Sequence, residues 1–413
     1  MVARDSLGSS RWLPDGAKDL PPEEALAFRR VERAMCGVMR SWGFEEVIPS
    51  SVQFYADPYP SGEGVERRVY SFPDGKGRLL ALRCEMTGPV ARMMSSRLGG
   101  FPAKVFYSGN VFRIEDDNSG LLNEFCQIGA EIIGDPQPVA DAESIALCGA
   151  CLMEAGVSEF VVGVGDVTVT NRFLEAGGLS EGLLKKALVA LKRRDMVEFE
   201  RVICGSREAM SRLRRVMRPM PADGSEARAL LSEPGLERLA QVVRAVKTFS
   251  PGITLYVDLS IVRNMSYYTG TVFEVYGKGL GRPIGGGGRY DHLLSRYGVD
   301  APATGFALTV QDVVSLVSAR QPAANETTGV LVAAAEGMFE TGVRVADSLR
   351  RRGFKVRFEA VACSREGAAE MAQGLGFDEV VYVTRDGCEE LSLTMPRRHV
   401  RPVALSGSAA GIH

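Results

Sequence analysis

The segment from Glu124 to Gly134 constrains the fold more than any other part of the chain. Its apolar residues alternate with Gln127, Gly129 and Glu131, which is the period of a β-strand with one apolar and one polar face. An amide and a carboxylate on either side of a glycine leave room for a ligand above that glycine. The segment therefore predicts a strand whose polar face is either solvated or the floor of a binding pocket.

Two further segments, 82–87 and 111–115, alternate in the same way and are expected to be strands of the same sheet. The residues on their predicted polar faces are Arg83, Glu85, Thr87, Arg113 and Glu115. Three strands with one polar face each predict a sheet with helices behind it and a polar pocket in front.

The polar residues of these strands also indicate a kind of ligand. An ammonium group would suit Glu85 and Gln127, and an imidazole or amide would suit Glu131, because a buried carboxylate without a partner is costly. We expect Glu131 to lie on the exposed polar face of its strand, so that removing its side chain opens no cavity in the core.

The segments around residues 270 and 288 contain several tyrosines and glycines. Tyr267, Tyr268 and Tyr290 are expected on strands, either as core residues or as a pocket wall whose hydroxyl groups donate hydrogen bonds. The glycine-rich segments 277–281 and 285–288 are expected to be hairpin turns. We do not expect them to cradle a phosphate, because neither stands between a strand and a helix.

The chain is predicted to consist of a core at 1–320, a polar linker at 321–328 and a small α/β domain at 329–413. Residues 180–248 are expected to form a helical insertion in the core. They hold 15 Lys and Arg against 9 Asp and Glu. This excess suits either a solvated helix face or a contact with RNA. Beyond the linker, strand-like and helical segments alternate, as in an α/β domain.

Composition limits the cofactors and the location that can be expected. Cys148 and Cys151 form a Cys-x-x-Cys in an apolar helical run, which favours buried thiols over a redox or metal site. No second pair completes a zinc site, and we expect no metal or cofactor. The formal net charge of −2 argues against a protein that coats nucleic acid or acidic membranes. We expect a cytoplasmic protein, since no apolar run approaches the ~20 residues of a membrane span.

Several segments together resemble the histidyl-tRNA synthetase family. They are Leu13–Asp19, Gly43–Pro49, Phe112–Glu115, Phe125–Glu131, Tyr267–Glu274 and Gly287–Asp291. The second resembles class II motif 1, and the third and fourth resemble motif 2. The resemblance covers nearly the whole chain. It implies an α+β fold with a class II aminoacyl-tRNA synthetase-like antiparallel sheet flanked by helices, a homodimer formed through 22–49, and a C-terminal α/β domain similar to a degenerate anticodon-binding domain.

The resemblance also implies a histidine-binding site. The positions that match residues holding the α-amino end of histidine are Glu85, Thr87 and Gln127. The positions that match residues reading the imidazole are Glu131, Tyr268 and Tyr290. Arg113 matches the motif 2 arginine that contacts the ATP α-phosphate in the enzymes, and Arg263 matches an arginine that stabilises charge during histidine activation. With Tyr267, these residues form the expected histidine-binding set.

The departures from the synthetase pattern indicate a different function. Asp312 stands where motif 3 of the enzymes has an arginine that grips ATP phosphate, and a carboxylate there would repel a triphosphate. The motif 2 loop carries Asp116 and Asp117, with Leu121 in place of an arginine. Residues 263–266 read Arg-Asn-Met-Ser where the family has Arg-Gly-Leu-Asp. The amino-acid pocket therefore resembles that of the enzymes, whereas the ATP pocket does not.

This combination resembles the synthetase-like regulatory subunits of ATP phosphoribosyltransferase. The resemblance implies a non-catalytic subunit that is required for the first step of histidine biosynthesis and takes part in histidine feedback. Its implied partners are a short-form catalytic subunit and L-histidine, and its implied assembly is a homodimer within a hetero-octamer. No membrane and no nucleic acid are expected. The alternative is an active histidyl-tRNA synthetase.

Overall fold

The computed structural model describes residues 13–55, 69–98, 100–114, 121–203, 211, 213–214, 216–262, 267–318, 329–377, 379–392 and 400–403. The chain divides into two compact units, residues 1–322 and 323–413. The expected linker at 321–328 lies outside the described residues.

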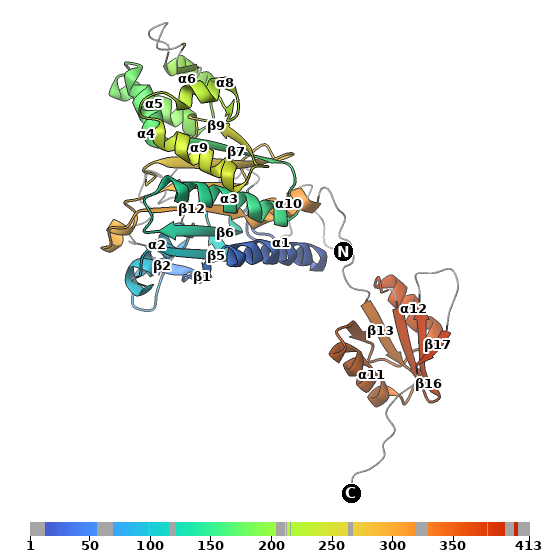
Figure 1. Ribbon diagram of the computed structural model, residues 1–413. Coiled ribbons are helices and arrows are strands. Elements are labelled where there is room, and N and C mark those ends of the chain that lie inside the picture. Colours follow the sequence, from blue (N-terminus) through green and yellow to red (C-terminus); the bar gives the residue numbers. More distant parts are fainter. Residues whose placement is uncertain are drawn as a thin grey trace. The chain divides into compact units, whose positions relative to one another are not determined.

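A nine-stranded mixed sheet forms the centre of the first unit (Figure 1). In sheet order its strands are β1 (Glu45–Glu46), β5 (Ala103–Phe112), β6 (Glu124–Ile133), β12 (Ala303–Thr309), β11 (Gly285–Arg289), β10 (Thr271–Gly277), β7 (Phe160–Asp166), β9 (Thr254–Val257) and β8 (Met220–Pro221). Each pair of neighbouring strands from β5 to β7 in this order is antiparallel, whereas β1 pairs with β5, and β9 with β7, in parallel. The prediction of a sheet flanked by helices is confirmed.

Helices cover the apolar face of this sheet. They include α1 (Pro22–Ser41), α3 (Pro138–Glu154) and α10 (Val310–Ser318). Their buried residues share one core with Cys126, Ile128, Ala130 and Ile132 of β6. The predicted alternation of β6 is therefore confirmed: its even-numbered residues pack under the helices, and Gln127, Gly129 and Glu131 face the other way. Cys148 and Cys151 are buried in α3, as expected.

A smaller core lies on the opposite face of the sheet. It is built by α2 (Thr87–Met93), the adjoining π-helix Met94–Leu98 and the 3-10 helix Leu294–Tyr297, packed against residues of β5 and β6. A three-stranded sheet, in the order β2 (Val52–Phe54), β4 (Leu79–Leu82) and β3 (Ser71–Pro73), leads into α2. This layer encloses the polar face of β6 and hence the candidate site.

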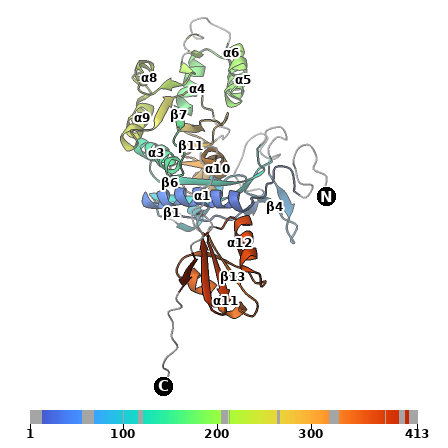
Figure 2. The same ribbon diagram turned by 90° about the vertical axis from the view of Figure 1, so that its right-hand side faces the viewer.

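The segment 167–249 is largely helical. It contains α4 (Val167–Ala176), α5 (Glu181–Lys192), α6 (Met196–Val202), α8 (Ser225–Leu231) and α9 (Glu237–Phe249). Figure 2 shows these helices gathered at one end of the first unit. The short strand β8, which joins the edge of the sheet beside β9, was not expected within this helical region.

Three local predictions were wrong. Residues 83–86 do not continue a strand, because β4 ends at Leu82 and α2 begins at Thr87, and β4 belongs to the three-stranded sheet and not to the sheet of β5 and β6. Gly285–Gly288 is no turn but most of β11, and the reason is steric: a Cβ at Gly287 would lie 1.9 Å from the carbonyl oxygen of Gly305 on the neighbouring strand. Gly288 also has a φ of +155°, which side-chain-bearing residues rarely adopt. Tyr267 and Tyr268 precede β10 and Tyr290 directly follows β11, so none of the three is on a strand.

The second unit is a five-stranded sheet in the order β14 (Lys355–Phe358), β13 (Gly329–Ala334), β15 (Glu379–Thr384), β16 (Gly387–Ser392) and β17 (Val400–Val403). Helix α11 (Phe339–Arg351) packs with Val330 and Val332 of β13, and α12 (Arg365–Gly374) packs with Leu331 and Ala333. Successive residues of β13 therefore face different helices, which explains its continuous apolar run. The two antiparallel strands β16 and β17 were not predicted.

Candidate ligand-binding site

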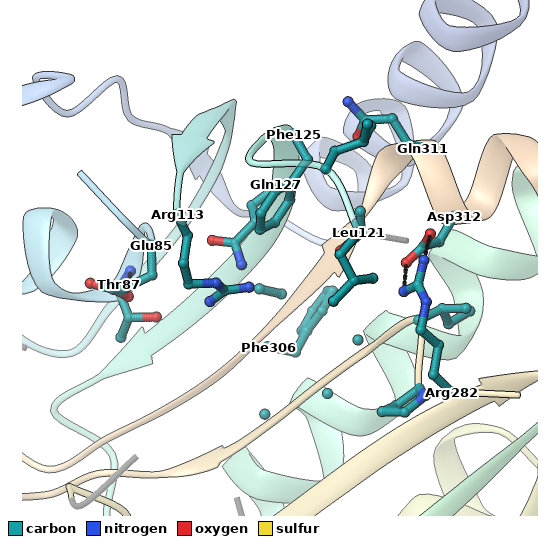
Figure 3. Close-up of a pocket in the computed structure, with 18 of the residues that line it drawn as sticks. Glu85, Thr87, Arg113, Leu121, Phe125, Gln127, Arg282, Phe306, Gln311 and Asp312 are labelled. Atoms are coloured by element: carbon teal, nitrogen blue, oxygen red, sulfur yellow. Dashed lines mark hydrogen bonds and ion pairs between the residues drawn. The ribbon is translucent and has the colours of Figure 1, made fainter. Parts of the chain in front are cut away.

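A cavity of about 720 Å³ lies over the polar face of β6. Eight of the nine residues expected in the histidine site line it: Glu85, Thr87, Arg113, Gln127, Glu131, Tyr267, Tyr268 and Tyr290. The ninth, Arg263, lies outside the described residues, as do Glu115 and the loop residues Asp116 and Asp117. The structure thus brings together side chains from widely separated segments, and Figure 3 labels Glu85, Thr87, Arg113 and Gln127 among them.

Glu85 is held at the cavity wall by the turn into α2. Its two carboxylate oxygens accept hydrogen bonds from the backbone N–H groups of Thr87 at 2.6 Å and Gly88 at 2.9 Å. The side chain is only 5% exposed, and this burial raises the pKa of Glu85 to about 7. Arg83, which was expected on the same face, instead donates to the carbonyl oxygens of Pro49 and Asn110 and does not line the cavity.

Glu131 lies deeper than expected. It is 1% exposed, and its carboxylate accepts hydrogen bonds from the Tyr290 hydroxyl at 2.5 Å and the Tyr107 hydroxyl at 3.2 Å. Burial raises the pKa of Glu131 to about 8, although the tyrosine hydroxyls oppose this shift. The expectation of an exposed carboxylate, removable without disturbing the core, was therefore wrong.

Gln127 presents an unused hydrogen-bond acceptor. Its Oε1 atom is buried and has no hydrogen-bond partner among the residues that the structure describes. Buried polar atoms in proteins are nearly always paired, so such an atom in a cavity wall points to a ligand or a water. Either would supply the missing hydrogen-bond donor.

Gly129 does not leave the open space that the sequence pattern indicated. A Cβ there would meet the Phe306 carbonyl oxygen at 2.1 Å and the Tyr107 hydroxyl at 2.6 Å. Tyr107 of β5, which pairs with Gly129 across the sheet, fills this space. Sequence reasoning missed Tyr107, because nothing in its own segment marks it as a partner of Glu131.

The tyrosines form an aromatic wall beside Glu131. Tyr267 lies edge-on to Tyr290, with ring centroids 5.6 Å apart, and its centroid is 4.9 Å from that of Tyr268. The side chain of the neighbouring Arg289 is 2% exposed and pairs with the buried Asp141 and with Asp291. These ion pairs hold the backbone that carries Tyr290. The wall is therefore preorganised by residues outside the cavity.

Arg113 is a cavity-lining cation close enough to Glu85 to act on its charge. Its guanidinium lies over the Phe125 ring, 5.1 Å from the centroid. Figure 3 shows it pointing into the cavity between Glu85 and Leu121. An arginine at this place suits a carboxylate or another anionic group of a ligand.

The far end of the cavity has a different character. Arg282, in the segment between β10 and β11, donates from both terminal nitrogens to the two oxygens of Asp312, at 2.5 and 2.6 Å. Lys18 pairs with Glu24 there, at 2.5 Å. Sequence reasoning picked out Asp312 but missed Arg282, whose pairing depends on the fold. The acidic end thus offers raised-pKa carboxyl groups, and the far end offers an arginine that is already paired with a carboxylate.

Comparison with known proteins agrees with this architecture. The model of the family described as histidyl-tRNA synthetase matches residues 16–313. An ATP phosphoribosyltransferase regulatory subunit from Moorella thermoacetica is 36% identical over 389 residues, which cover 89% of this chain and 96% of the relative. Its counterpart from Desulforamulus reducens is 32% identical, covering 94% of this chain and all of the relative.

A solved structure gives the same answer. The ATP phosphoribosyltransferase regulatory subunit/histidyl-tRNA synthetase from Bacillus halodurans superposes with a TM-score of 0.78 at 28% identity, covering 90% of this chain and 98% of that chain. Fold and sequence together place the molecule in the histidyl-tRNA synthetase-like class of class II folds. Within that class, the chain belongs to the family of ATP phosphoribosyltransferase regulatory subunits.

Proposed function

We propose that the chain is a non-catalytic regulatory subunit of ATP phosphoribosyltransferase that binds L-histidine in the cavity over β6. It assembles in the cytoplasm with the short catalytic subunit, supports the first step of histidine biosynthesis and takes part in histidine feedback. The observation that carries the proposal is the asymmetry of the cavity, which has two buried carboxyl groups at one end and an arginine paired with Asp312 at the other.

The acidic end matches the groups of histidine one by one. The ligand's ammonium group would lie by Glu85 and donate to the unpaired Oε1 of Gln127. Its imidazole N–H would donate to Glu131 beside the tyrosine wall, and its carboxylate would face Arg113. A cationic ligand stabilises the ionised form of two carboxyl groups that burial otherwise disfavours.

The far end supports a role other than aminoacylation. An active synthetase must hold the polyphosphate of ATP, and the bidentate pair of Arg282 with Asp312 leaves that arginine already neutralised. The alternative of an active histidyl-tRNA synthetase is therefore not favoured.

The proposed assembly contains a homodimer built through residues 22–49 and the strands that follow them. Several apolar side chains in this region are exposed, among them Ile48 at 80% and Phe54 at 53%. Apolar surface of this kind is typical of interfaces between subunits. We propose that the homodimer is part of a hetero-octamer with the catalytic subunit.

Reconstitution with the short catalytic subunit of the same organism tests this function. We expect the two chains to co-elute in gel filtration, and the mixture to transfer phosphoribose from the pyrophosphate donor to ATP at least tenfold faster than the catalytic subunit alone. Two chains that elute separately, together with histidine-dependent pyrophosphate exchange by this chain alone, would instead support the synthetase.

A further inference from the structure

The far end of the cavity contains the parts of an anion site. Arg282 presents a planar guanidinium fork, whose geometry matches phosphate and carboxylate oxygens. It faces the first turn of the nine-residue helix α10, where the helix dipole favours a negative charge. The side chain of Arg282 is 42% exposed, so a ligand can approach it from the cavity.

The anion in this site is supplied by the chain itself. Asp312 stands in the first turn of α10, and both of its oxygens accept from the Arg282 fork. Its side chain is only 8% exposed and is held in place by the helix that carries it. Figure 3 shows the pair at the end of the cavity opposite Glu85 and Thr87.

We propose that Asp312 is a built-in substitute for a phosphate group, which occupies Arg282 and so excludes polyphosphates from the cavity. The pair is a specificity device: it reserves the cavity for a ligand that uses the acidic end. This inference deepens the proposed function and rests on it, because the proposed function supplies histidine as the ligand for which the cavity is reserved.

Asp312 could keep anions out in two ways, by occupying Arg282 or simply by repelling a negative charge, and the two predict different results. Because Asp312 is tethered next to the fork, it competes with any free anion at a high effective concentration. Removing its charge should therefore release Arg282 for a new ligand. Under simple repulsion, removing the charge should help an anion to bind whether or not Arg282 is present.

Calorimetry with inorganic tripolyphosphate separates the two cases. We expect Asp312→Asn to bind tripolyphosphate at least tenfold more tightly than the wild type, and the double variant Asp312→Asn/Arg282→Gln to lose this gain. Asp312→Glu, which keeps a carboxylate, should gain nothing. Asp312→Ser replaces the Asn variant if thermal unfolding shows that the latter is not folded.

An ion pair elsewhere in the unit provides the matched control. Asp74 pairs with Arg78 at 2.7 Å in the turn before β4, so Asp74→Asn makes the same change in net charge away from the cavity lining. It should leave tripolyphosphate binding unchanged. The inference is overturned if Asp312→Asn binds no more tightly than the wild type, or if the double variant gains as much as the single one. Titration of the wild type with L-histidine tests the proposed function separately.

Discussion

The most informative single substitution is Glu131→Gln. Glutamine keeps the shape of the side chain, its amide oxygen can accept from one of the Tyr290 and Tyr107 hydroxyls and its NH2 group can donate to the other, but it cannot ionise. The larger change to alanine would leave two buried hydroxyls without their partner, because Glu131 is 1% exposed. Replacement by glutamine therefore isolates the contribution of the carboxylate charge to histidine binding.

The expected magnitude follows from the charge and the pKa. A hydrogen bond to a charged group contributes roughly 1.5–3 kcal/mol, so losing the charge should weaken histidine binding by about 10- to 150-fold above pH 8, where Glu131 is already ionised in the empty cavity. With a pKa of about 8, Glu131 is about 90% protonated at pH 7 in the empty cavity, and Glu85, with a pKa of about 7, is about half protonated. If both bind the ligand as carboxylates, the wild type should release more protons on binding at pH 7 than the variant, which has lost the Glu131 proton.

Isothermal titration calorimetry in buffers of different ionisation enthalpy measures both the affinity and the number of protons released. Glu124→Gln is a matched control on the same strand, since Glu124 is exposed and does not line the cavity. It should bind histidine like the wild type. An affinity for Glu131→Gln within twofold of the wild type, with unchanged proton release, would refute the assignment of Glu131 to the ligand.

Three further predictions concern the ligand-free protein and the supports of the site. Folding raises the pKa of Glu131 from 4.5 to about 8. The stability that this group contributes is therefore present below pH 4.5 and is lost as the pH rises through 8. Glu131→Gln should unfold at a higher temperature than the wild type at pH 8, but not at pH 4. In Gly305→Ala the new Cβ would lie 1.6 Å from Glu131 Oε2, so calorimetry should show at least tenfold weaker histidine binding; normal binding would contradict this geometry. Asp141→Asn removes the charge that pairs with Arg289 and Arg238, and urea denaturation should show a loss of roughly 3–5 kcal/mol, whereas a loss below about 1 kcal/mol would show that the pairs are not important.

Sequence patterning predicted the parts of the site that depend on a single strand. The alternation from Glu124 to Gly134 placed Gln127 and Glu131 on one face because the side-chain period of a strand is fixed by the backbone. It could not predict that Glu131 is buried. That burial depends on Tyr290, which is 159 residues away in the sequence, and on Tyr107 across the sheet.

The incorrect and missing predictions have similar causes. Residues 82–87 read as a strand, but Arg83 satisfies its guanidinium on the backbone carbonyls of Pro49 and Asn110, and the chain turns there into α2. The Gly285–Gly288 segment reads as a turn, but its glycines allow close contact with β12. Arg282 is an isolated charge in the sequence, and only the fold brings it to Asp312. Each depends on a contact between distant segments.

The structure also bears on the membrane expectation. No helix among the described residues is both long enough and apolar enough to cross a membrane.

The central claim, that histidine acts on the transferase through this cavity, is tested most directly by an inhibition curve. Transferase rate is measured against L-histidine concentration for complexes of the catalytic subunit with the wild-type chain and with Gln127→Ala, which removes the unpaired Oε1 from the cavity wall. Feedback requires histidine to bind two states of the complex with different affinity. We predict that the Gln127→Ala complex assembles, keeps nearly all of its rate without histidine, and needs at least several-fold more histidine for half inhibition. An unchanged inhibition curve, from a variant chain that by itself no longer binds histidine, would contradict the claim and place the feedback site on the catalytic subunit.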